Sequence, residues 1–174
     1  MNILIRQERE TDFDSVYAVV RSAFETMEVA SGDEQDLVNR LRKSSAFIPE
    51  LSLVAVCDGK IVGHIMFTKM KVGIHPALAL APVAVLPEYQ KQGIGGKLIA
   101  EGHRIARELG HSVAILVGHP NYYQRFGYQP AGNFNIQAPF DVPADAFMVL
   151  ELREGGLMGV SGLIEFAPEF FPET

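Results

Sequence analysis

The sequence contains a single cysteine, Cys57, and no tryptophan. One cysteine cannot form a disulfide within the chain, so a disulfide framework is excluded and a reducing cytoplasm is the expected compartment. Apolar runs are also short, because Gly, Pro or a charged residue interrupts each of them well before the ~20 residues that a membrane-spanning helix needs. The opening residues Met1–Arg6 lack the layout of a signal peptide. We therefore expect a cytoplasmic protein without a membrane partner.

Basic residues are outnumbered, with 15 Lys and Arg against 21 Asp and Glu and a formal charge of −6. General nucleic-acid binding requires clustered Lys and Arg that displace counterions from phosphates, so no nucleic-acid partner is expected. An acidic surface is compatible with a cationic substrate, although such surfaces are common. The chain is 48% hydrophobic and 21% charged. This ordinary globular composition and the length of 174 residues favour one domain over residues 1–174.

Alternating strand and helix patterns predict an α/β fold. Extended apolar runs predict strands at Ile3–Arg6, Leu53–Val56, Ile61–Phe67, Ala77–Val85, Val113–Val117, Phe147–Leu152 and Leu163–Phe166. Helical spacing predicts a helix capped by Thr11, a helix from Asp33, a helix that ends at Leu109 before Gly110, and a short helix from Pro120 to Phe126. Asp58-Gly59 predicts a hairpin turn. Pro82 cannot donate to a strand ladder, so it predicts a bulge or a place where strands part.

A glycine-rich segment, Gln90-Lys91-Gln92-Gly93-Ile94-Gly95-Gly96-Lys97, lies between a predicted strand and a predicted helix. Glycine permits a tight turn and a close approach of ligand to backbone, and the first amides of a helix are unpaired donors at its positive end. These features predict an anion site, to which Lys91 and Lys97 add positive charge. A nucleotide loop of the Walker or dinucleotide type is disfavoured because both patterns fail at Leu98. A helix-capping turn remains the alternative.

Two motifs in this order resemble those of the GNAT superfamily of N-acetyltransferases. The loop pattern is met by Gln90, Gly93 and Gly95, and the flanking residues Val83–Tyr89 match as well. About thirty residues later, Tyr123–Tyr128 resembles the Tyr-x-x-x-Gly-Phe signature, with Tyr128 in place of Phe. Two further segments, Gly118–Tyr123 and Phe147–Leu152, resemble a bacterial subgroup of YhbS-like acetyltransferases.

The resemblance implies the GNAT fold, a central mixed twisted β-sheet flanked by helices, with splayed strands that form an acetyl-CoA cleft. It implies acetyl-CoA as cosubstrate, no metal, and a primary amine of a small molecule or peptide as acceptor. The implied contact with the pantetheine arm is the backbone of Val83, Ala84 and Val85. The implied pyrophosphate ligands are the amides of Gln92, Gly93, Ile94, Gly95, Gly96 and Lys97, with Lys91 beside them and Gln90 supporting the loop. Asn121 and Tyr123 are implied to lie near the thioester.

Tyr123 is the candidate general acid, because a phenol with a pKa of about 10 suits the protonation of a departing thiolate. Packing of Tyr123 against Phe126 is the alternative, and Tyr122 replaces Tyr123 as the candidate if the helix register differs. The general base stays open. No Asp or Glu occurs in residues 73–89 except Glu88, which leaves water, Glu25, Glu28 or His119.

Other features leave alternatives. The histidines show no metal-ligand spacing. Cys57 is expected to pack as a small hydrophobe. The acceptor pocket is expected from Phe24–Gly32 and from the chain after Tyr128. Phe170-Phe171 is expected to dock into the core or into a second subunit, so the protein is a monomer or a homodimer. A non-catalytic module that binds acyl-CoA is the alternative to an enzyme.

Overall fold

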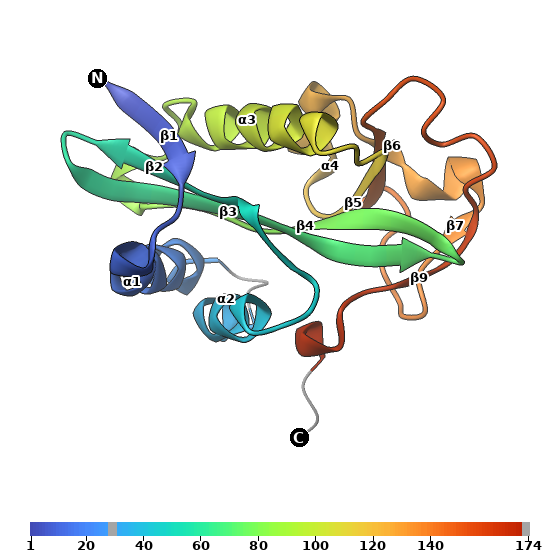
Figure 1. The fold of residues 1–174 in the computed structure, drawn as a ribbon, viewed down its shortest axis with the longest axis horizontal. Coiled ribbons are helices and arrows are strands. Elements are labelled where there is room, and N and C mark those ends of the chain that lie inside the picture. The colour runs from blue at the N-terminus through green and yellow to red at the C-terminus, as the bar shows by residue number, and fades with distance from the viewer. Residues whose placement is uncertain (28–30, 172–174) are drawn as a thin grey trace.

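The computed structural model describes residues 1–27 and 31–171, in which a mixed sheet carries helices on both faces (Figure 1). The strands are β1 (Ile3–Gln7), β2 (Phe47–Cys57), β3 (Lys60–Val72), β4 (His75–Val85), β5 (Val113–Val117), β6 (Gln129–Pro130), β7 (Ile136–Gln137), β8 (Phe147–Glu151) and β9 (Gly162–Glu165). The helices are α1 (Phe13–Glu25), α2 (Glu34–Arg42), α3 (Ile94–Glu108) and α4 (Pro120–Tyr123), with short 3-10 helices at Glu10–Asp12, Pro87–Tyr89, Gln124–Phe126, Ala131–Phe134 and Pro168–Phe170.

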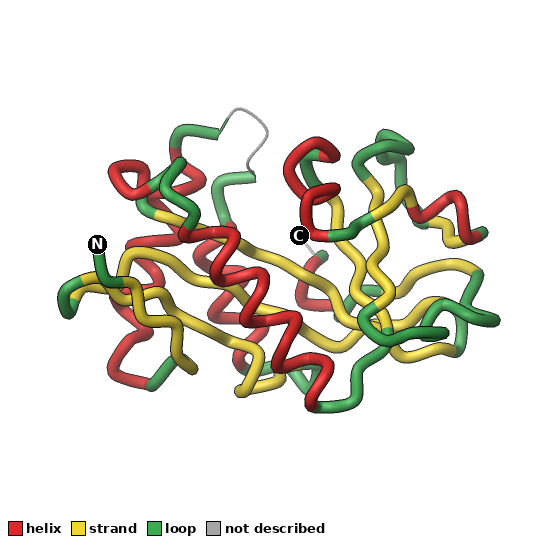
Figure 2. The backbone as a smooth tube through the Cα atoms, turned by 90° about the horizontal axis from the view of Figure 1, so that it is seen from above, coloured by secondary structure: helices red, strands yellow, loops and turns green. Residues whose placement is uncertain are grey.

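The strands follow the order β1-β2-β3-β4-β5-β8-β6, and β9 pairs with both β3 and β7. Neighbours are antiparallel except for the β4–β5 and β7–β9 pairs, which are parallel. Helix α3 covers one face of the sheet, and α1 and α2 cover the other (Figure 1). Viewed from above, α3 runs obliquely across the strands (Figure 2). The predicted mixed sheet flanked by helices is therefore confirmed.

The hairpin between β2 and β3 confirms the turn predicted at Asp58-Gly59. Asp58 has φ 49° and Gly59 has φ 82°, the left-handed values that a two-residue hairpin turn requires. Strand β3 continues past the predicted end at Phe67 to Val72. In that extension Lys69 is exposed and Met70 is buried, so the alternation of polar and apolar residues marks a strand with one solvated face.

The predicted cap at Thr11 is wrong. Thr11 lies inside the 3-10 helix Glu10–Asp12, and α1 begins one residue after Asp12. The Asp12 carboxylate accepts a hydrogen bond of 2.7 Å from the backbone amide of Arg9 and a bidentate pair from Arg6. These bonds lower the pKa of Asp12, with the contact to Arg6 as the largest cause. The Asp12 side chain thus bonds to the start of the 3-10 helix and to β1, and it forms no capping bond to α1.

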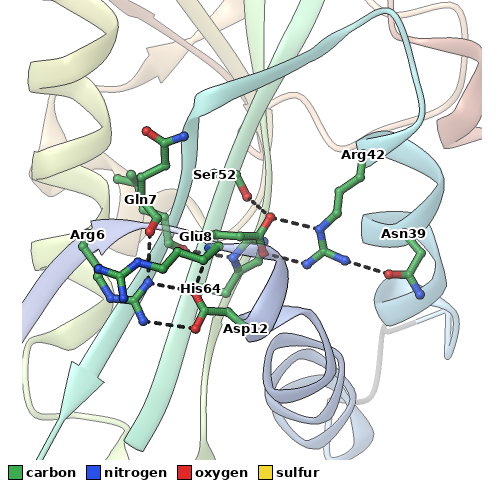
Figure 3. Close-up of polar contacts among 10 residues, drawn as sticks. Arg6, Gln7, Glu8, Asp12, Asn39, Arg42, Ser52 and His64 are labelled. Atoms are coloured by element: carbon green, nitrogen blue, oxygen red, sulfur yellow. Dashed lines mark hydrogen bonds and ion pairs between the residues drawn. The ribbon is translucent and has the colours of Figure 1, made fainter. Parts of the chain in front are cut away.

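A buried ion pair joins the end of β1 to α2 (Figure 3). Arg42 donates from Nε to one carboxylate oxygen of Glu8 at 2.9 Å and from Nη2 to the other at 2.6 Å. Ser52 of β2 donates to the same carboxylate at 2.8 Å. The Arg42 and Glu8 side chains are only 7% and 3% exposed. Because each oxygen is satisfied, the burial of these charges is tolerated, and the pair fixes α2 against the sheet.

The end of the described chain returns to α2. Ser44 donates to the carboxylate of Glu169 at 2.7 Å, and Arg40 donates to the Glu169 carbonyl at 3.2 Å. The core consists of two clusters of buried apolar side chains, one that includes Leu41 of α2 and one that includes Ile164 of β9. Phe170 packs against both clusters, whereas Phe171 remains 61% exposed. The prediction that this segment docks into the core is thus confirmed for Phe170. Within residues 1–27 and 31–171, no helix combines the length and apolarity needed to cross a membrane.

Candidate functional site

The parallel strands β4 and β5 separate soon after they meet. Their ladder consists of two residue pairs, Leu78 with Ala114 and Ala79 with Ile115. Strand β4 then continues for six residues, to Val85, along β3 alone. The backbone of Val83, Ala84 and Val85 therefore has its β3 edge paired and its other edge directed to the opening between β4 and β5.

A bulge in β4 lies at the point of separation. Leu80 pairs with Phe67 and Val83 pairs with Ile65, so Ala81 and Pro82 together face the single residue Met66. Proline lacks the amide that a regular ladder needs at this position. The disturbed pairing predicted at Pro82 is confirmed, and the bulge marks where the Val83–Val85 segment begins.

The segment after β4 is tied back to the strand by side-chain amides. Gln90 donates from Nε2 to the carbonyl of Val85 at 2.9 Å, and Gln92 donates to the carbonyl of Glu88 at 3.3 Å. Lys91 has φ 62° and Gly93 has φ 84°, so the backbone reverses sharply before α3. Gln90 is thus placed where a buttress between strand and loop is expected.

The first turn of α3 presents unpaired amides. The Lys97 amide bonds to the carbonyl of Gly93 at 3.1 Å. For the amides of Ile94, Gly95 and Gly96, no acceptor occurs within the described parts of the chain. This turn contains no acidic side chain, and the exposed Lys91 and Lys97 flank it. Free donors at the positive end of a fifteen-residue helix make this turn a candidate anion site.

Helix α4 and the turn after it lie against this anion site. A Cβ added to Gly95 would lie 2.7 Å from the Tyr122 hydroxyl, and one added to Gly96 would lie 3.4 Å from the Phe126 ring. A side chain at Gly95 would therefore force the Tyr122 side chain to shift, whereas one at Gly96 would make an ordinary van der Waals contact with Phe126. At Gly95 and Gly96, the first turn of α3 thus contacts the segment Tyr122–Phe126, which we call the tyrosine segment.

Tyr123 is partly buried beside the end of β5. A Cβ added to Gly118 would lie 2.5 Å from its ring, and the rings of Tyr122 and Tyr128 meet it edge-on at centroid distances of 5.0 and 6.0 Å. Burial raises the pKa of Tyr123, and the neighbouring Tyr122 raises it further. The phenol therefore keeps its proton at neutral pH. The aromatic packing expected as the alternative role is present, but its partners are Tyr122 and Tyr128.

Tyr128 adds a polar contact beneath this aromatic group. Its hydroxyl lies 2.9 Å from Nε2 of His103 on α3, and both side chains are buried. The His103 ring also stacks on Phe67 of β3 at 5.8 Å. Burial lowers the pKa of His103 to about 4, and Arg107 lowers it further, so the imidazole is neutral. This bond connects α3 directly to the segment that carries Tyr123.

Of the base candidates, neither Glu25 nor His119 forms a side-chain hydrogen bond with a residue that the structure describes. Glu25 is exposed at the end of α1, and His119 is exposed just before α4. Glu28 lies outside the described residues. Asn121 is exposed on α4, one residue before Tyr122. Where the structure is described, no three His, Cys, Asp or Glu side chains gather at a spacing that would hold a metal ion, and Cys57 is buried as predicted.

Comparison with known proteins identifies the family. The acetyltransferase (GNAT) domain family matches the chain over residues 4–131. The chain belongs to the GNAT acetyltransferase family. N-acetyltransferase YhbS of Escherichia coli K12 is 32% identical over 171 residues, which cover 97% of this chain and 98% of YhbS. N-acetyltransferase YjhQ of the same strain is 40% identical over 126 residues, 70% of each chain. This GNAT protein is accordingly an acyltransferase.

Two crystal structures resemble the GNAT fold seen here over nearly the whole chain. Escherichia coli YhbS in complex with CoA has a TM-score of 0.90 and 30% identity, and the match covers 100% of this chain and 94% of that one. A GNAT acetyltransferase from Brucella melitensis in complex with acetyl-CoA has a TM-score of 0.80 and 32% identity, and the match covers 97% and 98% of the two chains. The resemblance of the sequence to YhbS-like acetyltransferases is confirmed.

Three contributions to this GNAT site were missed by sequence analysis: the contact of Tyr122 with Gly95, the bond between Tyr128 and His103, and the position of Arg125. Arg125 lies with its guanidinium carbon 4.6 Å from the centre of the Tyr122 ring. A signal for this contact was available, because residues three apart in a helical segment lie on one face. No sequence signal links Tyr128 to His103, which are 25 residues apart.

Proposed function

We propose that this acyltransferase moves the acetyl group of acetyl-CoA to a primary amine by direct attack within a ternary complex. The observation that carries the proposal is the opening between β4 and β5 beside the unpaired amides of Ile94, Gly95 and Gly96. Support comes from the two GNAT structures of similar sequence, which contain CoA and acetyl-CoA.

The residues present fit a coenzyme whose diphosphate is anionic and whose pantetheine arm carries amides. The amides of residues 92–96, Gln92 to Gly96, bind the diphosphate, whereas the Lys97 amide is bonded to the Gly93 carbonyl, so Lys97 contributes through its side-chain charge, as Lys91 does. Val83, Ala84 and Val85 offer the backbone edge that faces β5 to the pantetheine arm. Gln90 holds the loop to this strand, and Asn121 binds the arm from α4.

The chain's own groups supply the chemistry of transfer. A backbone amide of Val83–Val85 polarises the thioester carbonyl, as donors of an oxyanion hole do. The amine nitrogen forms a bond to the carbonyl carbon while the carbon–sulfur bond breaks. Tyr123 gives its proton to the departing sulfur. Its raised pKa keeps the phenol protonated before the transfer and also lowers the driving force for that transfer, compared with a phenol of ordinary pKa. Water removes the proton of the amine, because no carboxylate lies in the Val83–Val85 segment.

The acceptor is a primary amine of a small molecule or a peptide. Its pocket draws on the Phe24–Gly32 segment, of which residues 28–30 lie outside the described chain, and on the chain after Tyr128. The experiment that tests the function combines calorimetry of acetyl-CoA and CoA binding with an acetyl-CoA consumption assay across an amine panel. Small cationic amines are tested first, because the protein carries a charge of −6. An absence of binding heat from both coenzyme forms would refute the proposal.

The Tyr123→Phe variant tests the role of the proposed acid. We expect kcat to fall about 10²-fold, the size of a general-acid contribution, while the Kd of acetyl-CoA changes less than about twofold. Tyr17→Phe is the matched control, because the Tyr17 hydroxyl bonds to Asp36 between α1 and α2. If Tyr123→Phe retains the kcat of Tyr17→Phe, Tyr123 is not the acid.

A further inference from the structure

Arg125 has an exposed guanidinium that aromatic rings hold in place. Its central carbon lies 4.6 Å from the centroid of the Tyr122 ring and 5.6 Å from that of Phe126. Its Nε donates to the Tyr122 carbonyl at 3.4 Å. A cation over an aromatic face is attracted by the negative charge of the ring, so these contacts restrict the side chain while the guanidinium edge remains open to solvent.

The rings under Arg125 are the same rings that lie on α3. The Tyr122 hydroxyl is seated on Gly95 and the Phe126 ring on Gly96, in the first turn of the helix. Arg125 therefore stacks on the aromatic rings that lie against the first turn of α3, the turn with the unpaired amides of Ile94, Gly95 and Gly96. The same two rings thus contact both the guanidinium and the first turn that carries the free donors.

The charge of Arg125 is not matched by a carboxylate. Arg6, Arg40, Arg42 and Arg104 each form an ion pair with Asp or Glu, whereas Arg125 forms none with any residue that the structure describes, as is also true of Arg9, Arg21, Arg107 and Arg153. The first turn of α3 also lacks an acidic side chain. A guanidinium presents several donors in a planar fork that fits phosphate oxygens. An arginine held here without an acid partner is suited to a phosphate ligand.

We propose that Arg125 is a phosphate ligand of the coenzyme, which completes the anion site of α3 from the side of the tyrosine segment. Tyr122 positions this guanidinium through its ring face. The inference rests on the proposed function and deepens it. It assigns to the Tyr122–Phe126 segment a part in binding the phosphates, in addition to the proton held by Tyr123.

Calorimetry on the full chain tests the assignment with CoA, 3′-dephospho-CoA and pantetheine as probes. We expect Arg125→Gln to weaken CoA binding about tenfold, the loss typical of one charge-assisted hydrogen bond, and to leave pantetheine binding unchanged. Arg125→Lys should fall between, because a point charge replaces the fork. A loss that persists with 3′-dephospho-CoA assigns the diphosphate, and a loss that disappears assigns the 3′-phosphate.

Arg153→Gln is the matched control, because Arg153 is also exposed and follows β8 beyond Glu151, which pairs with the first residue of β5. It removes the same charge at the opposite end of β5 and should leave CoA affinity unchanged. Wild-type affinity in Arg125→Gln overturns the assignment of Arg125 but leaves the proposed function intact. Equal losses for CoA and pantetheine also overturn it. An absence of CoA binding by the wild-type protein overturns both.

Discussion

At the residue scale, Gly95 shows how a glycine of the loop pattern leaves room for a neighbouring side chain. A Cβ there would lie 2.7 Å from the Tyr122 hydroxyl, too close for a Cβ, so the Tyr122 side chain would have to shift. Gly93 is constrained differently, since its φ of 84° is a left-handed conformation that glycine adopts without strain. The two glycines of the motif thus have different roles: Gly95 leaves space for Tyr122, and Gly93 allows the left-handed backbone turn.

Gly95→Ala is predicted to weaken CoA binding with little loss of stability. Alanine favours the helix, and the Tyr122 side chain yields by rotation, so the free energy of unfolding should change by less than about 1 kcal/mol. The displaced ring enters the phosphate site, and we expect the Kd for CoA to rise about tenfold. Calorimetry and urea denaturation measure the two effects.

Gly132→Ala is the control for this substitution, because a Cβ at Gly132 would meet no atom within 4 Å. It should leave both CoA affinity and stability unchanged. Equal affinities of the Gly95 and Gly132 variants would contradict the proposed placement of Tyr122 at the phosphate site.

At the scale of elements, α3 is joined to the tyrosine segment at two levels. Its first turn meets Tyr122 and Phe126, and its middle meets Tyr128 through His103. The GNAT signature ends in Phe where this chain has Tyr128, and the extra hydroxyl is the atom that bonds to His103. The departure from the family pattern therefore has a structural partner, which was not visible from the motif.

Tyr128→Phe is predicted to lower the free energy of unfolding by about 1–3 kcal/mol, because it leaves Nε2 of the buried His103 without a partner. His103→Leu combined with Tyr128→Phe removes both polar groups and should recover part of that loss. A double-mutant cycle by urea denaturation measures the coupling. Additive effects of the two changes would contradict a hydrogen bond between these side chains.

At the scale of the whole molecule, two buried histidines make stability depend on pH. Burial lowers the pKa of both His64 and His103 to about 4. At His64 the charge of Glu8 raises the pKa and that of Arg42 lowers it, in a site where Nδ1 bonds to the Leu53 carbonyl at 2.9 Å. The unfolded chain protonates histidine near pH 6.5, so between pH 6.5 and 4 the unfolded state binds more protons than the folded state.

We predict that the free energy of unfolding has its highest value above pH 6.5 and falls as the pH drops toward 4. Each of the two histidines contributes a loss of about 2 kcal/mol between pH 7 and pH 5. The stabilisation that comes from the lowered pKa of Asp12 is lost in a separate pH range, below about pH 4. Urea denaturation at several pH values measures the slope, and His103→Leu should reduce it by about half. A flat profile from pH 7 to 5 would show that both rings are solvated.

Much of the architecture was predictable because it depends on local patterns. The Asp58-Gly59 turn, the end of α3 before Gly110 and the strand at Val113–Val117 each follow from adjacent residues, and the structure confirms them. The predicted Thr11 cap failed because Asp12 is held by Arg6 of β1, a contact outside the local pattern. Strands β6 and β7 were missed because each has two residues, too few for a periodicity.

The sequence by itself determined the family and the order of its two motifs, since a turn and a helix start are encoded within a few consecutive residues. Only the tertiary structure decided where β4 and β5 part, which aromatic side chain lies against Gly95, and which buried polar groups pair. The Glu8–Arg42 bond joins residues 34 apart, and the Ser52–Glu8 bond joins residues 44 apart. Such contacts form only when the sheet packs against its helices, so they cannot be predicted from the spacing of residues along the chain.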